Sequence, residues 1–190
     1  MDSKAAEENL MELKRAFDSQ GVKFWLTGGV LLGAVRDKDF IPWDEDIDLI
    51  MLAEDYDSSF CDQLRAKNFV CSETRIYLNK VSAVALTKRN IRTDLILQYY
   101  YPLDDVYVYL AKYPCDHGII TPAKFYKNDC FIEFLGQKFR VPNPPEEWLD
   151  WVFDKKWRTP VKTGWSKDYK RISLDKYLKW FKENDRTSNP

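Results

Sequence analysis

An acidic cluster that runs straight into an apolar segment is the feature that most constrains the fold of this chain. The cluster and the apolar residues after it are Asp44, Glu45, Asp46 and Asp48, then Leu49, Ile50, Met51 and Leu52. A solvated acidic loop does not usually lead directly into a buried strand, because an unpaired carboxylate is costly to bury. The pattern therefore predicts a strand over residues 47–52 that sets carboxylates into the edge of the core.

The spacing of Asp46 and Asp48 is that of two side chains on one face of a strand. Side chains alternate between the two faces, so these carboxylates lie roughly 7 Å apart on one face and the intervening residues point to the other. At this spacing their oxygens can converge on one hard cation such as Mg²⁺, which relieves their mutual repulsion. An exposed strand edge decorated with acids gives the same pattern, so the motif alone leaves both interpretations open.

Two further features favour the metal interpretation. Gly28 and Gly29 lie between a predicted strand and a short predicted helix, where bare backbone N–H groups can receive a phosphate. Asp94 opens another apolar run and again sets a carboxylate into a buried strand. If the two acidic strands are neighbours, three carboxylates converge opposite the glycine turn. Metal held by acids, together with backbone donors for phosphate, is what phosphoryl or nucleotidyl transfer requires.

The charge and composition of the chain exclude several classes of function. Its 190 residues carry 29 basic and 30 acidic side chains, so the net charge of -1 offers no global field for nucleic acid or an anionic membrane. No apolar run approaches the roughly 20 residues of a membrane span, and the charged N-terminal segment lacks the pattern of a signal peptide. The four cysteines show no C-x-x-C pairing; an even count also permits two disulfides, but we expect free thiols and a cytoplasmic protein.

The order of the predicted elements indicates one α+β domain over residues 1–190, with a helical C-terminal part at about 143–190. The expected strands cover residues 22–26, 47–52, 75–78, 81–87, 91–101 and 106–113, followed by a hairpin of 131–135 and 138–141. The expected helices are a segment that ends near Gly21, then residues 30–35, 55–67, 145–157 and 174–182.

The stretch "WLTGGVLLGAVRDKDFIPWDEDIDL" at residues 25–49 resembles the signature of the LicD/fukutin family, W-L-x-G-G-T-L-L-G-x-x-R followed by I-P-W-D-x-D-x-D. A second block of that family is similar to "IEFLGQKFRVPNPPEEWLDWVFDKKWRTP" at residues 132–160. The resemblance implies a nucleotidyltransferase-like mixed β-sheet flanked by helices. It also implies a Mg²⁺- or Mn²⁺-dependent transferase, which moves phosphocholine or phosphoalditol from a CDP-linked donor to a hydroxyl of a glycan or small acceptor.

By position, the resemblance assigns the family's glycine turn and metal pair to Gly28, Gly29, Asp46 and Asp48. Asp94 matches the family's third strand acid, and would either complete the metal site or take the proton from the acceptor hydroxyl. The chain departs from the family at Val30, where threonine is usual, and so lacks a hydroxyl that could contact phosphate.

Three other residues are candidates for substrate binding. The resemblance suggests that Arg36 contacts a donor phosphate, although an arginine at the C-terminal end of a helix also balances the helix dipole. Asp44 would either order the loop beside the metal pair or be solvated. Lys80, in the hairpin before the third acid, would either contact phosphate or face solvent.

Two other functions stay open on the sequence. A nucleotidyltransferase that transfers from a nucleoside triphosphate to a small molecule would use the same metal and phosphate groups. A catalytically inactive relative that binds a glycan or a partner belongs to a different class of protein. The intact pair of Asp46 and Asp48 argues against inactivity, because a dead copy has no physical reason to keep buried acids.

Overall fold

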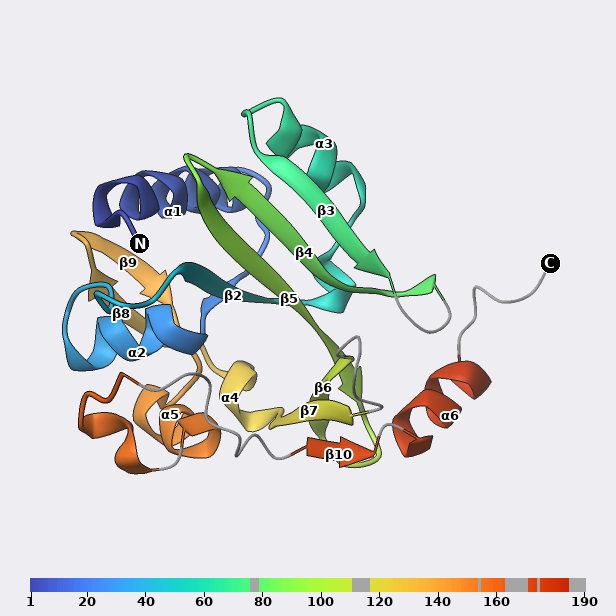
Figure 1. The fold of residues 1–190 in the computed structure, drawn as a ribbon. Coiled ribbons are helices and arrows are strands. Elements are labelled where there is room, and N and C mark those ends of the chain that lie inside the picture. Colours follow the sequence, from blue (N-terminus) through green and yellow to red (C-terminus); the bar gives the residue numbers. More distant parts are fainter. Residues whose placement is uncertain (76–78, 111–116, 154, 163–170, 174, 185–190) are drawn as a thin grey trace.

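The computed structural model of the chain describes residues 1–75, 79–110, 117–153, 155–162, 171–173 and 175–184 (Figure 1). Within these residues, eight strands form one mixed sheet and two more form a separate hairpin. Helices flank the sheet, and two of them belong to the C-terminal part, as predicted. None of the helices within the described ranges is long and apolar enough to cross a membrane.

The helices are α1 (Ser3–Asp18), α2 (Gly28–Arg36), α3 (Ser59–Arg65), α4 (Lys124–Lys127), α5 (Pro145–Phe153) and α6 (Asp175–Asn184), with 3-10 turns η1 (Ala53–Asp55) and η3 (Lys155–Arg158). The strands of the sheet are β1 (Trp25–Leu26), β2 (Asp46–Leu52), β3 (Val70–Arg75), β4 (Val81–Lys88), β5 (Ile91–Tyr101), β6 (Val106–Leu110), β7 (His117–Pro122) and β10 (Arg171–Ser173). The hairpin consists of β8 (Phe131–Phe134) and β9 (Gln137–Arg140).

Several predicted bounds need correction. The helix predicted to begin at residue 30 begins at Gly28, because the carbonyl of Thr27 already accepts the N–H of Leu31 at 3.1 Å. The first strand is shorter than predicted, since β1 pairs with β2 only at Trp25 and Leu26. The helix predicted over 55–67 is divided into η1 and the shorter α3.

Strands β3, β7 and β10 and helix α4 were not predicted from the sequence. Strand β3 pairs with β4 alone, and its first residue Val70 is 68% exposed, so it lacks the buried alternation that identifies a strand. The predicted strand over 75–78 is wrong at its start, since residue 75 ends β3, and residues 76–78 lie outside the described ranges. Residues 111–113, which end another predicted strand, residue 174, which begins a predicted helix, and Cys115 also lie outside the described ranges. The other three cysteines, Cys61, Cys71 and Cys130, are free thiols, as predicted.

The centre of the sheet is the parallel pair of β2 and β5. Their register sets Asp48 beside Asp94, and the next three pairs along the strands, from Leu49 beside Leu95 onward, are apolar on both strands. On its side away from β2, β5 pairs antiparallel with β4 along residues 91–96 and with β6 along residues 98–101. The β4–β5 turn at Arg89 and Asn90 has both residues at positive φ, of 51° and 59°, which is the geometry of a tight hairpin.

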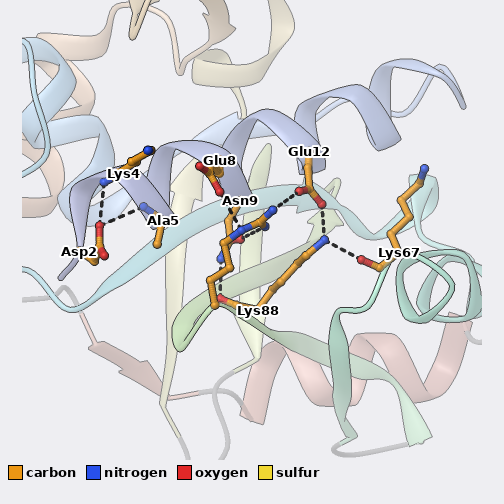
Figure 2. Close-up of polar contacts among 9 residues, drawn as sticks. Asp2, Lys4, Ala5, Glu8, Asn9, Glu12, Lys67 and Lys88 are labelled. Atoms are coloured by element: carbon orange, nitrogen blue, oxygen red, sulfur yellow. Dashed lines mark hydrogen bonds and ion pairs between the residues drawn. The ribbon is translucent and has the colours of Figure 1, made fainter.

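Helix α1 is tied to this hairpin by a polar network (Figure 2). The fully buried side chain of Asn9 donates from Nδ2 to the carbonyl of Lys88 at 2.7 Å and accepts at Oδ1 from Arg89 at 2.8 Å. Glu12 receives hydrogen bonds from both Lys88 and Arg89. Because Lys88 ends β4 and Arg89 lies in the turn that leads into β5, the network fixes the start of the strand that carries Asp94.

Aromatic side chains of the helices pack at both ends of the sheet. Phe17 of α1 stacks on Phe60 of α3 with ring centroids 4.8 Å apart, and both rings are buried in the main core. Helix α6 covers the other end of β5, where Tyr177 contacts Tyr101 with ring centroids 4.6 Å apart. In Figure 1, α2, α4 and α5 lie together below the start of β2, where the acids are.

Candidate active site

Three carboxylates meet where β2 and β5 run side by side. Asp48 and Asp94 are register partners on adjacent parallel strands, and Asp46 precedes Asp48 by one period of the strand. One oxygen from each of the three lies within 4.8 Å of the others, although Asp48 is only 5% exposed. The structure thus brings together all three acids that the sequence nominated as metal ligands, by the strand pairing on which that prediction depended.

The two glycines at the start of α2 leave space for the carboxylates of the site. A Cβ on Gly28, whose φ is +53°, would overlap the carboxylate of Asp48 and lie 2.8 Å from its Cβ. A Cβ on Gly29 would overlap the carboxylate of Asp44. The N–H of Gly29 also donates a hydrogen bond to Asp48. The glycine pair therefore packs the helix start against the acidic cluster.

Burial and mutual repulsion raise the pKa values of the acids. Burial, together with the charges of Asp46, Asp94 and Asp44, raises the pKa of Asp48 to about 8. Burial and the charge of Asp46 raise the pKa of Asp44 to about 6. The pKa of Asp46 is also raised, by burial and then by the charge of Asp94. Shifts of this direction are those of carboxylates whose charge is not fully compensated.

Arg92 is the charged residue of this site that the sequence analysis missed. Its Nε lies 2.9 Å and 3.0 Å from the two oxygens of Asp94, and 60% of its side chain is exposed. Arg92 and Asp94 are two residues apart on β5, so they share a face. That spacing, an arginine one strand period before a nominated acid, was visible in the sequence and could have identified it.

The other three nominated residues lie in different places. Asp44 is half-buried beside Gly29, next to the acidic cluster. Arg36 instead donates to Asp37 at 2.8 Å and 2.7 Å and to the carbonyl of Trp157 at 3.0 Å, which joins α2 to η3. The ammonium group of Lys80 lies 5.6 Å from the centre of the Tyr99 ring. Neither Arg36 nor Lys80 lines the cavity at the acids, and their contact with phosphate remains a prediction.

A cavity of about 510 Å³ extends from the acids along the face of the sheet. Asp48, Arg92 and Asp94 line it together with the first turn of α2, and α5 contributes Trp148 and Val152. Its floor continues along β5 to Gln98, which is four residues and therefore about 13 Å beyond Asp94. Trp148 is buried, at 3% exposure, and also lines the cavity.

We expect Gly28→Ala to disrupt the acidic cluster and Gly136→Ala to leave it intact. Both glycines have positive φ, so alanine carries the same backbone cost of about 1–2 kcal/mol at either position. Only at Gly28 does the added Cβ meet the carboxylate of Asp48, since nothing lies within 4 Å of a Cβ at Gly136. Thermal unfolding with and without Mg²⁺ measures the difference. Gly136→Ala should keep the rise in melting temperature caused by Mg²⁺, and Gly28→Ala should lose it; a full Mg²⁺ response in Gly28→Ala would contradict this account.

Comparison with known proteins places this geometry in a family. Residues 21–144 match the family model described as LicD/FKTN/FKRP, nucleotidyltransferase domain. The ribitol-5-phosphate transferase FKTN of Homo sapiens is 28% identical over 170 residues, which cover 88% of this chain and 36% of that protein. The lipopolysaccharide cholinephosphotransferase LicD of Haemophilus influenzae is 51% identical over 35 residues, which cover 18% of this chain and 13% of the relative. The chain thus spans well under half of these relatives.

A solved structure confirms the predicted fold. The lincosamide antibiotic adenylyltransferase LnuA, in its lincomycin-bound crystal structure, superimposes with a TM-score of 0.50 at 14% sequence identity. The match covers 72% of this chain and 79% of that one. At this identity the likeness establishes the nucleotidyltransferase-like arrangement of sheet and helices, and nothing about the substrate.

Proposed function

The chain belongs to the LicD/FKTN/FKRP family, a family of nucleotidyltransferase-superfamily transferases, and on that premise we propose that it transfers a phospho-linked group from a CDP-activated donor to a hydroxyl group of a glycan or small acceptor. One observation carries the proposal: Asp46, Asp48 and Asp94 converge beside a cavity large enough for a nucleotide-linked donor. The names of the relatives support transfer of phosphocholine or of a phosphoalditol.

The acidic cluster fits a divalent cation. Carboxylate oxygens are the ligands that Mg²⁺ and Mn²⁺ prefer, and the three oxygens are close enough to share one ion. Asp46, Asp48 and Asp94 would hold it. When bound, the ion would neutralise negative charge on the donor's phosphates and orient them.

The protein's own groups would bind and orient the reactants around the cluster. Arg92 contacts both oxygens of Asp94 and so fixes the orientation of that carboxylate. Because its side chain is largely exposed, the guanidinium is also accessible to an anionic donor. The glycine start of α2 leaves the backbone close to the acids, so a phosphate could approach without meeting a side chain.

The transfer exchanges one bond to phosphorus for another. The acceptor oxygen forms a bond to the phosphorus of the transferred group, while the bond from that phosphorus to the bridging oxygen breaks. The electron pair of the broken bond leaves with CMP. A carboxylate of the cluster accepts the proton of the acceptor hydroxyl, and we assign this role to Asp94, because its side chain lines the cavity and is 23% exposed, whereas Asp48 is 5% exposed.

The test is release of CMP from a panel of CDP-linked donors, namely CDP-ribitol, CDP-glycerol and CDP-choline, with Mg²⁺ present. We expect release from at least one donor, its loss on chelation of the metal, and its loss in Asp48→Asn. Arg36→Lys, outside the cavity lining, shows whether the predicted phosphate contact of Arg36 matters for the Michaelis constant. Release of pyrophosphate from a nucleoside triphosphate, with no CMP from any donor, would instead identify a nucleotidyltransferase that acts on small molecules.

A further inference from the structure

The wall of the cavity contains buried polar atoms without a hydrogen-bond partner of good geometry. Gln98 and Trp148 both line the cavity and are each 3% exposed. The amide oxygen Oε1 of Gln98 has no hydrogen-bond partner among the residues that the structure describes, and the indole Nε1 of Trp148 has none of good geometry, its candidate partner there being the hydroxyl of Tyr126. Leaving a buried donor or acceptor unpaired is unfavourable, so a ligand that supplies the missing hydrogen bonds gains binding energy here.

These atoms belong to a part of the cavity that the fold holds in place. Gln98 on β5 pairs with Tyr109 on β6, which pairs in turn with Ile119 on β7, and all three residues line the cavity. Helix α5 is fixed over this surface, since Trp151 donates from Nε1 to the carbonyl of Ile120 at 3.2 Å. Trp148, one turn earlier in α5, is therefore held above the sheet.

A hydroxyl-rich wall continues from Trp148. Thr121 of β7 lines the cavity at 2% exposure, and the hydroxyl of Tyr126 lies near the side chains of both Thr121 and Trp148. The geometry of these two contacts is poor, so the Tyr126 hydroxyl and the Trp148 N–H are only weakly paired. This end of the cavity thus offers a choice of neutral donors and acceptors.

Charge is confined to the opposite end. Among the described residues that line the cavity, only Asp48, Arg92 and Asp94 are charged, and all three belong to the acidic site. The separation of about 13 Å between Asp94 and Gln98 along β5 leaves room for a chain of several atoms beyond a phosphate bound at the acids. A substrate that spans the cavity therefore has a charged phosphate end and a neutral end.

We propose that Gln98 and Trp148 form a subsite for a neutral, polyhydroxylated part of the substrate, as in an alditol phosphate, and select against a trimethylammonium group. Each hydroxyl of a polyol both donates and accepts, so different hydroxyls of one substrate can satisfy the Gln98 amide and the Trp148 N–H. Rotation about the broad terminal torsion of Gln98 exchanges its amide oxygen and nitrogen, which lets it meet either kind of partner. A trimethylammonium group has no hydrogen bond to offer and leaves both groups unpaired. Cation–π attraction to the rings of Tyr109 and Trp148 would not supply those hydrogen bonds. This inference rests on the proposed transferase function and chooses between its two classes of transferred group.

Calorimetric titration in the presence of Mg²⁺ tests the subsite, with ribitol 5-phosphate, phosphocholine and CMP as probes. The wild-type chain should bind ribitol 5-phosphate about tenfold or more tightly than phosphocholine, a ratio that one or two buried hydrogen bonds account for. Gln98→Met, which keeps the volume and removes the amide, should weaken ribitol 5-phosphate about tenfold and leave phosphocholine and CMP unchanged. Trp148→Phe should act in the same direction.

The exposed Gln63 of α3 provides the matched control, as Gln63→Met should change none of the three affinities. Thermal unfolding of the metal-free variants is the second readout: Gln98→Met should not lower the melting temperature, because it replaces an unpaired oxygen with a thioether. Equal wild-type binding of phosphocholine and ribitol 5-phosphate would overturn the proposal. So would a loss confined to CMP in Gln98→Met, which would place the pyrimidine base at this end. CMP release from CDP-ribitol that Gln98→Met leaves unchanged would overturn the subsite while leaving the transferase function standing.

Discussion

Asp48→Asn is expected to abolish transfer while making the metal-free protein more stable. Asparagine fills the same volume but grips a divalent cation poorly, so turnover should fall on the order of a thousandfold. Without metal, the substitution removes a carboxylate that is 5% exposed and surrounded by Asp44, Asp46 and Asp94. The free energy of unfolding should therefore rise, since folding no longer requires this carboxyl either to take up a proton or to bury its charge beside the other acids.

Substitutions of the neighbouring acids distinguish a metal site from an acidic surface that binds no metal. Asp46→Asn and Asp94→Asn should each lose activity to a similar degree, because each supplies one of the three converging oxygens. Glu45→Gln is the matched control: Glu45 is exposed and stands between two members of the cluster, so activity and stability should stay near those of the wild type. Turnover and melting temperature with and without Mg²⁺ give the result. An inactive Glu45→Gln beside an active Asp48→Asn would mean that the site is on the other face of β2.

The acidic cluster was predictable from the sequence because local patterns determine it. The spacing of Asp46 and Asp48 sets their common face, and the apolar run after Asp94 marks a strand of the same character. Only the pairing of β2 with β5 had to be assumed, and two buried strands with an acid at the start are natural neighbours at the centre of a sheet.

The neutral end of the cavity was not predictable in the same way. Gln98 and Trp148 are 50 residues apart in the sequence and meet the same cavity only because α5 packs across β7. Trp148 also has the helical spacing of an ordinary core residue, so its unpaired N–H is visible only in the folded chain. Long-range packing of this kind leaves no local signature in a single sequence.

The glycines show how a correct motif can take on a different structural role. Gly28 and Gly29 were predicted as a turn that presents N–H groups to a phosphate. In the structure they begin α2 and make room for the carboxylates of Asp48 and Asp44. Both roles depend on the absence of a glycine side chain. The sequence pattern shows that this side chain is absent, but it does not show which group occupies the space.

The metal-free protein should lose stability as the pH rises from 5 to 8. The pKa of Asp48 is raised from 3.8 to about 8 in the folded state, so the folded chain keeps a proton that the unfolded chain has already released in this interval. Because the folded state binds more protons there, the free energy of unfolding falls with increasing pH, by about 1.4 kcal/mol per pH unit for one such group. Asp44, with a pKa of about 6, adds to the slope below pH 6.

Mg²⁺ should oppose this loss, because a cation held by the cluster stabilises the ionised carboxylates and competes with their protons. Urea unfolding at pH 5, 6, 7 and 8, in chelator and in excess Mg²⁺, measures both slopes. With chelator the free energy of unfolding should decline across the series, and with Mg²⁺ it should decline less or rise, so that the stabilisation by metal is largest at pH 8. Asp48→Asn should flatten the chelator series while Glu45→Gln leaves it unchanged. A chelator series that rises with pH in the wild type would show that Asp48 is already ionised without a cation, and would remove the electrostatic reason for placing a metal between β2 and β5.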